Sequence, residues 1–184
     1  MASWKPLLLK SLDSNAHLKH SAFFQLATIG SNGRPSNRTV VFRGFQEDTD
    51  MIQINTDCRS VKVCWYFTES WEQFRLKGTI DIIDATNSDA LKLQKREKAW
   101  FASSLKSRLQ YLAPTPSLPA IAIHDPGEEI QLDPSEGPVD AFCLLIFDPD
   151  QVDYLNLRSN ERLIFTSKPN GPSCKLWMSQ KINP

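Results

Sequence analysis

The sequence predicts a mainly β protein whose antiparallel strands form a closed or nearly closed barrel, with helical additions. Short apolar runs of strand length recur along most of the chain, and turn-forming residues bound each run. The connections between most of these runs are short, which favours an antiparallel meander over alternating βαβ units. For about eight or nine strands, closure into a barrel removes the exposed strand edges.

The N-terminal half begins with apolar residues near helical spacing, which predict a short helix over residues 4–18. AFFQLATI at 22–29 predicts a strand, and the Asn32-Gly33 pair that follows is a strong hairpin signal. NRTVVFRGF at 37–45 is then the partner strand of that hairpin. Three further strands are expected at 51–55, 63–67 and 73–83.

The C-terminal half begins with a segment rich in Ala, Leu, Lys, Gln, Arg and Glu, which predicts one inserted helix over 88–112, capped by Asn87 or Ser88. Residues 113–139 contain six prolines and predict a long loop. Strands are expected at 141–147 and 152–157, separated by a hairpin-like turn at Asp148-Pro149-Asp150. The last two strands are expected at 161–166 and 174–184.

These elements predict a single domain over residues 1–184. It divides into N-terminal barrel strands and helix at 1–112, the proline-rich loop at 113–139 and C-terminal strands at 140–184. The N-terminus has one brief apolar triplet broken by lysines, so we expect neither a secretory leader nor a membrane span. A cytoplasmic location is the expectation, with organellar import left open.

The charge balance and the motifs exclude several function classes. Lys and Arg total 21 and Asp and Glu total 21, so no overall positive field favours nucleic acid or an anionic membrane. The four cysteines lack CxxC spacing, and no complete metal-ligand set is present. The chain also lacks a GxGxxG motif and a P-loop. Any bound anion must therefore be held by a local cluster of cations.

One predicted strand carries an arginine on each face. Arg38 and Arg43 are five residues apart, and side chains alternate along a strand, so the two arginines point to opposite faces. Cations and hydrogen-bonding groups recur near the ends of the following strands, at Asn55-Thr56, Arg59-Ser60, Lys62, Gln73 and Arg75. Each residue alone is better explained as an exposed strand charge or a turn residue. Their order along one meander favours a site for a phosphate attached to a flat apolar ring.

The ordered segments RTVVFRGF, INTD, RS and WEQFRLKG resemble the FMN-binding split barrel of the pyridoxamine 5′-phosphate oxidase-like family. The likeness extends from Trp4 to Pro184 and includes QLATI, GRPSN, CWYF and the C-terminal INP. It implies a split barrel with an N-terminal helix and one inserted helix. It also implies a homodimer that holds FMN at the subunit interface and oxidises a phosphorylated small molecule.

The resemblance also implies roles for individual residues. Arg38 would pair with the FMN phosphate, and Gln73 would hydrogen-bond the edge of the isoalloxazine ring. Arg43 would lie near the ring and the substrate, with Arg162 as a second substrate contact. No catalytic residue and no metal ligand is assigned. The implied FMN-binding residues are Arg38, Thr39, Val40, Val41, Phe42, Arg43, Asn55, Thr56, Ser60, Lys62 and Gln73.

The chain departs from the family pattern after its third strand. Val61 replaces the arginine of a Ser-Arg-Lys phosphate motif. Lys62 meets Val63 directly, where the family has roughly three more helical turns. This apparent deletion predicts weaker FMN binding and lower stability than in a relative that has the segment. Ser107 and Arg108, after the inserted helix, match a patch that reaches the flavin of the partner subunit.

A second departure lies near the C-terminus, where the family oxidase has a tryptophan followed by an Arg-Leu-His-Asp-Arg motif. Here Leu155 stands in the tryptophan's place and the segment has no histidine, which argues against oxidation of pyridoxine or pyridoxamine phosphate. Two alternatives therefore stay open. The missing motif favours a non-catalytic protein that binds FMN or a phosphorylated vitamer, whereas the deletion favours an inactive shortened isoform.

Overall fold

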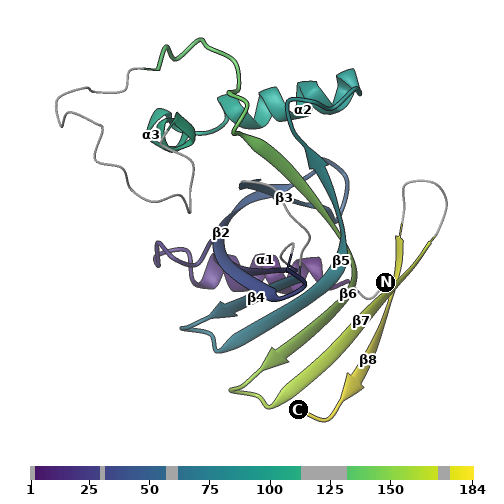
Figure 1. The fold of residues 1–184 in the computed structure, drawn as a ribbon. Coiled ribbons are helices and arrows are strands. Elements are labelled where there is room, and N and C mark those ends of the chain that lie inside the picture. The colour runs from purple at the N-terminus through teal and green to yellow at the C-terminus, as the bar shows by residue number, and fades with distance from the viewer. Residues whose placement is uncertain (1–2, 30–31, 57–61, 113–131, 170–174) are drawn as a thin grey trace. The chain divides into compact units, whose positions relative to one another are not determined.

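The structure is a computed structural model that describes residues 3–29, 32–56, 62–112, 132–169 and 175–184. Strands β1 to β6 form a closed antiparallel barrel, because β3 pairs with β6 as well as with β2. Strands β7 and β8 continue the sheet beyond β6 (Figure 1). The described strands are β1 (Phe23–Ile29), β2 (Pro35–Phe45), β3 (Ile52–Thr56), β4 (Lys62–Phe67), β5 (Glu72–Ile83), β6 (Cys143–Asn156), β7 (Glu161–Pro169) and β8 (Lys175–Ile182).

The chain divides into two compact units. The first, called here the barrel unit, comprises Met1–Ile82 and Leu145–Pro184, and the second, the helical unit, comprises Ile83–Leu144. The described helices are α1 (Lys5–Ser14) in the barrel unit and α2 (Ala90–Phe101), α3 (Leu105–Leu109) and the short 3-10 helix η1 (Gln110–Leu112) in the helical unit.

Alternation of side chains along the strands builds the core of the barrel unit. In β1, Phe24, Leu26 and Thr28 are buried while Phe23 and Gln25 are exposed, which is the period of two expected for a strand with one buried face. Aromatic residues of β1, β4 and β5 pack inside, with ring centroids 4.9 to 5.9 Å apart, and they are Phe24, Trp65, Phe67 and Phe74. Each such buried side chain contributes about 1.5–3 kcal/mol.

The N-terminal helix α1 packs against this core and is hydrogen-bonded to the β4–β5 hairpin. Its Leu8 is fully buried in the core cluster. The Ser11 hydroxyl donates to a carboxylate oxygen of Glu72 at 2.8 Å, and the Asn15 amide donates to the Ser70 hydroxyl at 3.1 Å. The predicted N-terminal helix is therefore present, although it ends at Ser14 rather than at residue 18.

The predicted β1–β2 hairpin is confirmed. The two strands pair antiparallel from Phe23↔Val41 to Ile29↔Pro35. Gly33, in the connection, has a φ of 73°, a conformation that glycine adopts without a steric penalty from Cβ. The hairpin fixes the register of the strand that carries Arg38 and Arg43.

The hairpin-like turn predicted at residues 148–150 is wrong, because β6 runs without interruption from Cys143 to Asn156. The Asp-Pro-Asp sequence is typical of a turn, but here the strand passes very close to β5. A Cβ on Gly78 of β5 would lie 2.1 Å from the carbonyl oxygen of Asp148. The Pro149 carbonyl accepts a hydrogen bond from the Lys175 ammonium at 2.7 Å. Tertiary contact within the barrel thus overrides the local turn preference.

The single inserted helix predicted over 88–112 is instead the pair α2 and α3 followed by η1. The predicted caps are also corrected, since Asp89 caps α2 and its carboxylate accepts from the backbone N–H of Leu91 at 2.9 Å. Ser104 caps α3 by accepting from the N–H of Ser107. Serine is a favourable N-cap, so a new helix begins after Ser104 and α2 does not continue through it.

Candidate flavin-binding face

The two faces of β2 separate the sequence-predicted residues into two groups. Val40 is buried and Phe42 packs against the core, so Arg38, which shares their face, points toward the interior side of the barrel wall. Thr39 and Arg43 are exposed on the other side, together with Val41. The two arginines therefore lie on opposite faces, as the spacing predicts.

Arg38 lies opposite Leu26 in the β1–β2 register. One of its Nη atoms is 3.4 Å from the Oγ1 of Thr28, a buried residue of β1, which is a long hydrogen bond. Arg43 lies five residues further along β2, just before Gly44, whose φ is 118°. The β2–β3 register shifts between Phe42 and Phe45, and this irregularity follows Arg43 directly.

The outward side of β1, β2 and β4, called here the outer face, contains a cavity of about 290 Å³. The register brings its lining together, because Gln25 of β1 lies opposite both Thr39 of β2 and Cys64 of β4. Gln25 and Thr39 hydrogen-bond at 3.0 Å. The cavity is lined by His20, Phe23, Phe24, Gln25, Thr39, Cys64 and Tyr66. It thus combines aromatic walls with several hydrogen-bonding groups.

Gln73, the predicted ring-edge residue, borders this cavity. It lies opposite Tyr66 in the β4–β5 register, and its amide nitrogen is 3.8 Å from the Cys64 sulfur. Burial raises the pKa of the Cys64 thiol, partly offset by the charge of Arg75 and the contact with Gln73. Because the thiolate is the reactive form, the raised pKa disfavours a nucleophilic role for Cys64.

A cluster of two arginines and one aspartate, called here the arginine cluster, continues the outer face across β5, β6 and β7. Asp153 accepts a hydrogen bond from Arg75 at 2.6 Å and two from Arg162, at 3.0 and 2.8 Å. Burial raises the pKa of Asp153, but the hydrogen bonds and charges of both arginines outweigh it, and the net pKa is lowered. Arg162 was assigned from the sequence, whereas Asp153 was not. In the sequence, Asp153 is marked only by its place in the strand expected at 152–157, directly after the expected turn.

The structure describes the remaining predicted residues only in part. Asn55 and Thr56 end β3 and are half-buried. Lys62 is the first residue of β4, and Ser60 lies outside the described residues. In the helical unit, Arg108 is 7% exposed and donates to the Pro134 carbonyl at 2.9 Å. Arg108 is therefore packed within its own unit, which does not favour a reach toward a second subunit.

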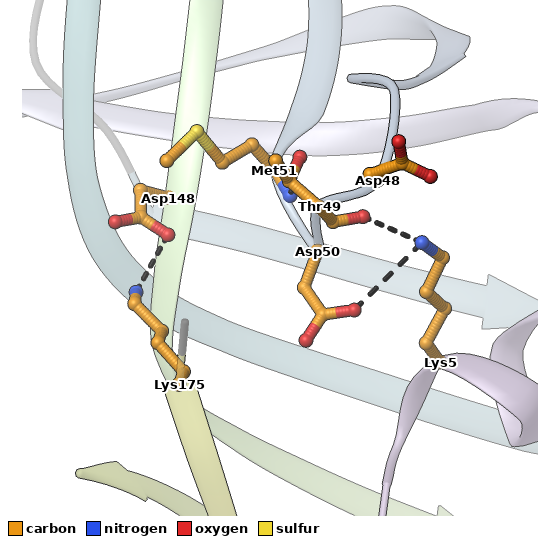
Figure 2. Close-up of a pocket in the computed structure, with 7 residues that line it drawn as sticks. All are labelled: Lys5, Asp48, Thr49, Asp50, Met51, Asp148 and Lys175. Carbon is orange, nitrogen blue, oxygen red and sulfur yellow. Dashed lines mark hydrogen bonds and ion pairs between the residues drawn. The ribbon is translucent and has the colours of Figure 1, made fainter. Parts of the chain in front are cut away.

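A second cavity of the barrel unit, of about 200 Å³, lies among the β2–β3 turn, the start of α1, β6 and β8 (Figure 2). Each of its two lysines pairs with an aspartate of the lining. Lys5 lies 3.8 Å from Asp50, and Lys175 lies 2.5 Å from Asp148, as the dashed lines of Figure 2 show. Trp177 donates to Asp50 at 2.8 Å. These contacts connect α1 and β8 to the barrel and give the cavity a structural role.

Neither a metal centre nor a membrane-spanning helix is found in the part of the chain that the structure describes. No group of three or more His, Cys, Asp and Glu side chains in the described ranges is arranged to hold a metal ion. Within the same ranges, no helix has the length and apolar character needed to cross a membrane.

Comparison with known proteins places this fold and face in a family. The family described as "Pyridoxamine 5′-phosphate oxidase, FMN-binding domain" matches residues 1–84. Over its whole length the chain is 54% identical to pyridoxine/pyridoxamine 5′-phosphate oxidase 2 of Arabidopsis thaliana and covers 98% of that protein. The chain belongs to the pyridoxamine 5′-phosphate oxidase-like family of FMN-binding split-barrel proteins.

Solved structures agree with this assignment. A pyridoxamine 5′-phosphate oxidase-related, FMN-binding protein from Nostoc punctiforme is 37% identical, with a TM-score of 0.88, and the match covers 100% of this chain and 99% of that one. PhzG from Burkholderia lata has a TM-score of 0.64 at 15% identity, over 98% of this chain and 90% of that one, which shows the shared fold. FMN is thus the cofactor of the domain that this chain contains.

The Arabidopsis alignment also bears on the apparent deletion. It extends over 195 positions, whereas this chain has 184 residues, so at least 11 positions of the relative face gaps in this chain. Three turns of α-helix contain about eleven residues. The total of these gap positions is large enough to include the roughly three helical turns expected after Lys62.

The described residues of the outer face fit the ring system of FMN. Phe23 and Tyr66 provide apolar walls, and the amides of Gln25 and Gln73 provide donors and acceptors for a polar ring edge. The phosphate end is described only in part, because Ser60 lies outside the described residues.

Proposed function

We propose that the chain is a flavin-dependent oxidoreductase that binds FMN on the outer face and oxidises a phosphorylated pyridine vitamer. The observation that carries the proposal is the full-length match to a relative named pyridoxine/pyridoxamine 5′-phosphate oxidase 2. It is supported by a cavity that Thr39 lines and whose lining residue Cys64 is in contact with Gln73. When bound, FMN supplies a hydride acceptor at its N5 atom.

The chain's own residues bind and orient the two ligands. Gln73 hydrogen-bonds the ring edge. The resemblance gives the cofactor phosphate to Arg38, Ser60 and Lys62, but Arg38 points to the interior side of β2, so this contact requires its guanidinium to turn toward the outer face. Arg43 and Arg162 contact the substrate. Charge-assisted hydrogen bonds of this kind neutralise the phosphate charge and hold both rings in place. Holding the reactants in position lowers the activation barrier of the reaction.

A homodimer is part of the proposal, with FMN held between two copies. The outer face exposes Phe23 and Tyr66, each 44% exposed, and the neighbouring Ile29 is 62% exposed. Apolar side chains grouped on one sheet face are typical of a surface that another chain covers. The outer-face cavity, at about 290 Å³, lies at the small end of the usual range for ligand sites, as expected if a second copy completes it.

The test is to purify the chain, measure flavin absorbance, and then add pyridoxamine 5′-phosphate in air. The proposed reaction converts this amine, O₂ and water into pyridoxal 5′-phosphate, ammonia and hydrogen peroxide, so aldehyde and peroxide should appear in equal amounts. A yellow protein that forms neither product would contradict oxidase activity.

Two other functions are each favoured by one observation. A non-catalytic FMN or vitamer-phosphate binding protein is favoured by Leu155 in the place of the family tryptophan and by the lack of a histidine in that segment. An inactive shortened isoform is favoured by the gap of at least 11 positions. The same purification separates them, because only the shortened isoform fails to take up FMN.

A further inference from the structure

We propose that Cys64 is a positioning residue for the flavin, because its sulfur holds the side-chain amide of Gln73 in one orientation toward the ring edge. This inference rests on the proposed function, which puts the ring of FMN on the outer face. It assigns a role to Cys64, for which the sequence pattern and the family resemblance gave none.

The backbone around Gln73 is held from two sides. Gln73 lies opposite Tyr66 in the β4–β5 register. The carboxylate of its neighbour Glu72, on the other face of β5, accepts hydrogen bonds from the hydroxyls of Ser11 at 2.8 Å and Tyr154 at 2.7 Å. Both of these hydroxyl residues are buried. The position of Gln73 along the strand is therefore fixed, and the freedom that remains is in its side-chain torsions.

Cys64 restricts these torsions. It pairs with Arg75 in the β4–β5 register, so Gln73, two residues earlier on β5, is its diagonal neighbour on the same face. Diagonal neighbours on one face of a sheet are within reach of long side chains. The amide nitrogen of Gln73 donates to the sulfur of Cys64 at 3.8 Å. Because Cys64 also lines the outer-face cavity, the amide is held at the border of that cavity.

The contact decides which groups the amide offers to a ligand. A glutamine amide has two unlike ends, an NH₂ group with two donors and an oxygen that accepts. With one N–H directed at Cys64, the second N–H and the oxygen stay available for the ring edge. An amide turned by half a rotation would exchange these donor and acceptor positions. Burial raises the pKa of the Cys64 thiol, so the sulfur is a neutral acceptor and brings no negative charge next to the ring.

A cysteine that only fills space between β4 and β5 would make the same contact. The two roles differ in whether the effect of removing the sulfur depends on Gln73. A packing role predicts an effect that remains when the Gln73 amide is absent. The positioning role predicts a change in flavin binding that disappears without this amide.

The experiment is a double-mutant cycle on the purified chain. Cys64→Ala, Gln73→Ala and the double variant are compared with the wild-type chain in the Kd of the apoprotein for FMN and in the midpoint potential of the bound FMN. The side-chain NH₂ resonances of Gln73 in the apoprotein follow the contact without FMN. Cys64→Ser tests rescue, because a hydroxyl also accepts from an amide N–H. Thr39→Val, which breaks the Gln25–Thr39 bond of the same cavity, replaces Gln73→Ala in a matched control cycle.

We expect Cys64→Ala to raise the Kd for FMN about two- to tenfold, which is the cost of ordering one flexible side chain on binding. The midpoint potential should shift as well, because hydrogen bonds to the ring tune its electronics. The Gln73 NH₂ resonances should move toward those of a mobile amide. Cys64→Ser should restore most of each value. In the Gln73→Ala background Cys64→Ala should change neither the Kd nor the potential, whereas in the Thr39→Val background it should keep its full effect.

Wild-type values in Cys64→Ala would overturn the positioning role, as would an effect of Cys64→Ala that persists at full size in the Gln73→Ala background. A Cys64→Ser variant that behaves like Cys64→Ala also counts against it. These results are separable from failure of the proposed function. A yellow chain that makes no aldehyde, but in which the Cys64 effect depends on Gln73, refutes the oxidase and keeps the positioning role. An active oxidase whose flavin is insensitive to Cys64→Ala refutes the positioning role alone.

Discussion

The hydroxyl of Tyr154 on β6 donates a hydrogen bond of 2.7 Å to a carboxylate oxygen of Glu72 on β5. The other carboxylate oxygen of Glu72 accepts from Ser11, so this pair also connects helix α1 to the barrel wall. Burial, followed by the hydrogen bond to Glu72, raises the pKa of Tyr154 to about 12.

The first prediction concerns the titration of this tyrosine. Because its folded-state pKa lies above the unfolded value of about 10, its stabilising effect is complete below pH 10 and is lost as the pH rises toward 12. Glu72→Gln should make Tyr154 ionise at lower pH, measured as phenolate absorbance at 295 nm. Tyr154→Phe identifies the step that belongs to this residue. Identical titration curves for Glu72→Gln and the wild-type chain would contradict the assignment.

The second prediction concerns the contact between β5 and β6. Gly78→Ala places a Cβ 2.1 Å from the backbone oxygen of Asp148, and neither strand can move without disturbing the barrel. The expected loss is about 3 kcal/mol or more in the free energy of unfolding. Gly137→Ala is the matched control, because no atom lies within 4 Å of its added Cβ, and it should change stability by less than about 0.5 kcal/mol. Similar denaturant midpoints for the two variants would show that the strands do not approach so closely.

The third prediction concerns the proposed phosphate contact of Arg38. Arg38→Ala should weaken FMN binding by about 1.5–3 kcal/mol, measured as the Kd of the apoprotein for FMN by fluorescence quenching. Arg34→Ala, at an exposed position just before β2, is the control and should leave the Kd unchanged. Thr28→Val removes one hydrogen-bond partner of Arg38 within the barrel wall. If Arg38 acts by contacting FMN, and not through this wall contact, the Thr28→Val variant should keep the wild-type Kd. An unchanged Kd in Arg38→Ala refutes the phosphate role.

The fourth prediction concerns the segment that the family resemblance indicates is absent after Lys62. Insertion of the corresponding segment of the Arabidopsis relative between Lys62 and Val63 should tighten FMN binding and raise Tm. An inserted Gly-Ser segment of equal length controls for chain length alone and should give neither gain. Equal flavin retention by the original chain and the chain with the restored segment would show that the deletion does not affect the cofactor.

The fifth prediction concerns the proposed dimer. Phe23→Asp places a charge on the outer face without removing a core residue, because Phe23 is 44% exposed. We expect the mass measured by light scattering to fall from that of two chains to that of one, and flavin content to fall with it. Leu91→Asp, at a more exposed position on α2, is the control and should keep the mass of the wild-type chain. A Phe23→Asp variant that keeps the wild-type mass would refute this interface.

The fold was largely predictable from the sequence because most of its strands are locally encoded. The alternation in β1 and the Asn32-Gly33 turn identify the hairpin without tertiary information. The errors have a common cause in long-range packing. Asp148-Pro149-Asp150 is a good local turn, but contact with Gly78 keeps it extended.

The placement of the candidate residues was predictable where it depends on a single strand, whereas contacts between distant strands were not. Alternation correctly separated Arg38 from Arg43, and the family motif pointed to Gln73 beside the cavity. Asp153 was missed because its partners, Arg75 and Arg162, are 78 and 9 residues away in sequence and meet only after the strands pair.

The chain leaves the barrel unit at the end of β5 and returns to it in β6, and these two strands are neighbours in the sheet. In terms of chain connectivity, residues 83–144 are therefore one very long hairpin loop. Closing a loop of this length instead of a four-residue turn costs only about 2–3 kcal/mol of entropy, because the cost grows with the logarithm of length. The barrel thus tolerates large changes at this one connection, and we expect an exchange of residues 83–144 between relatives to leave the barrel strands folded.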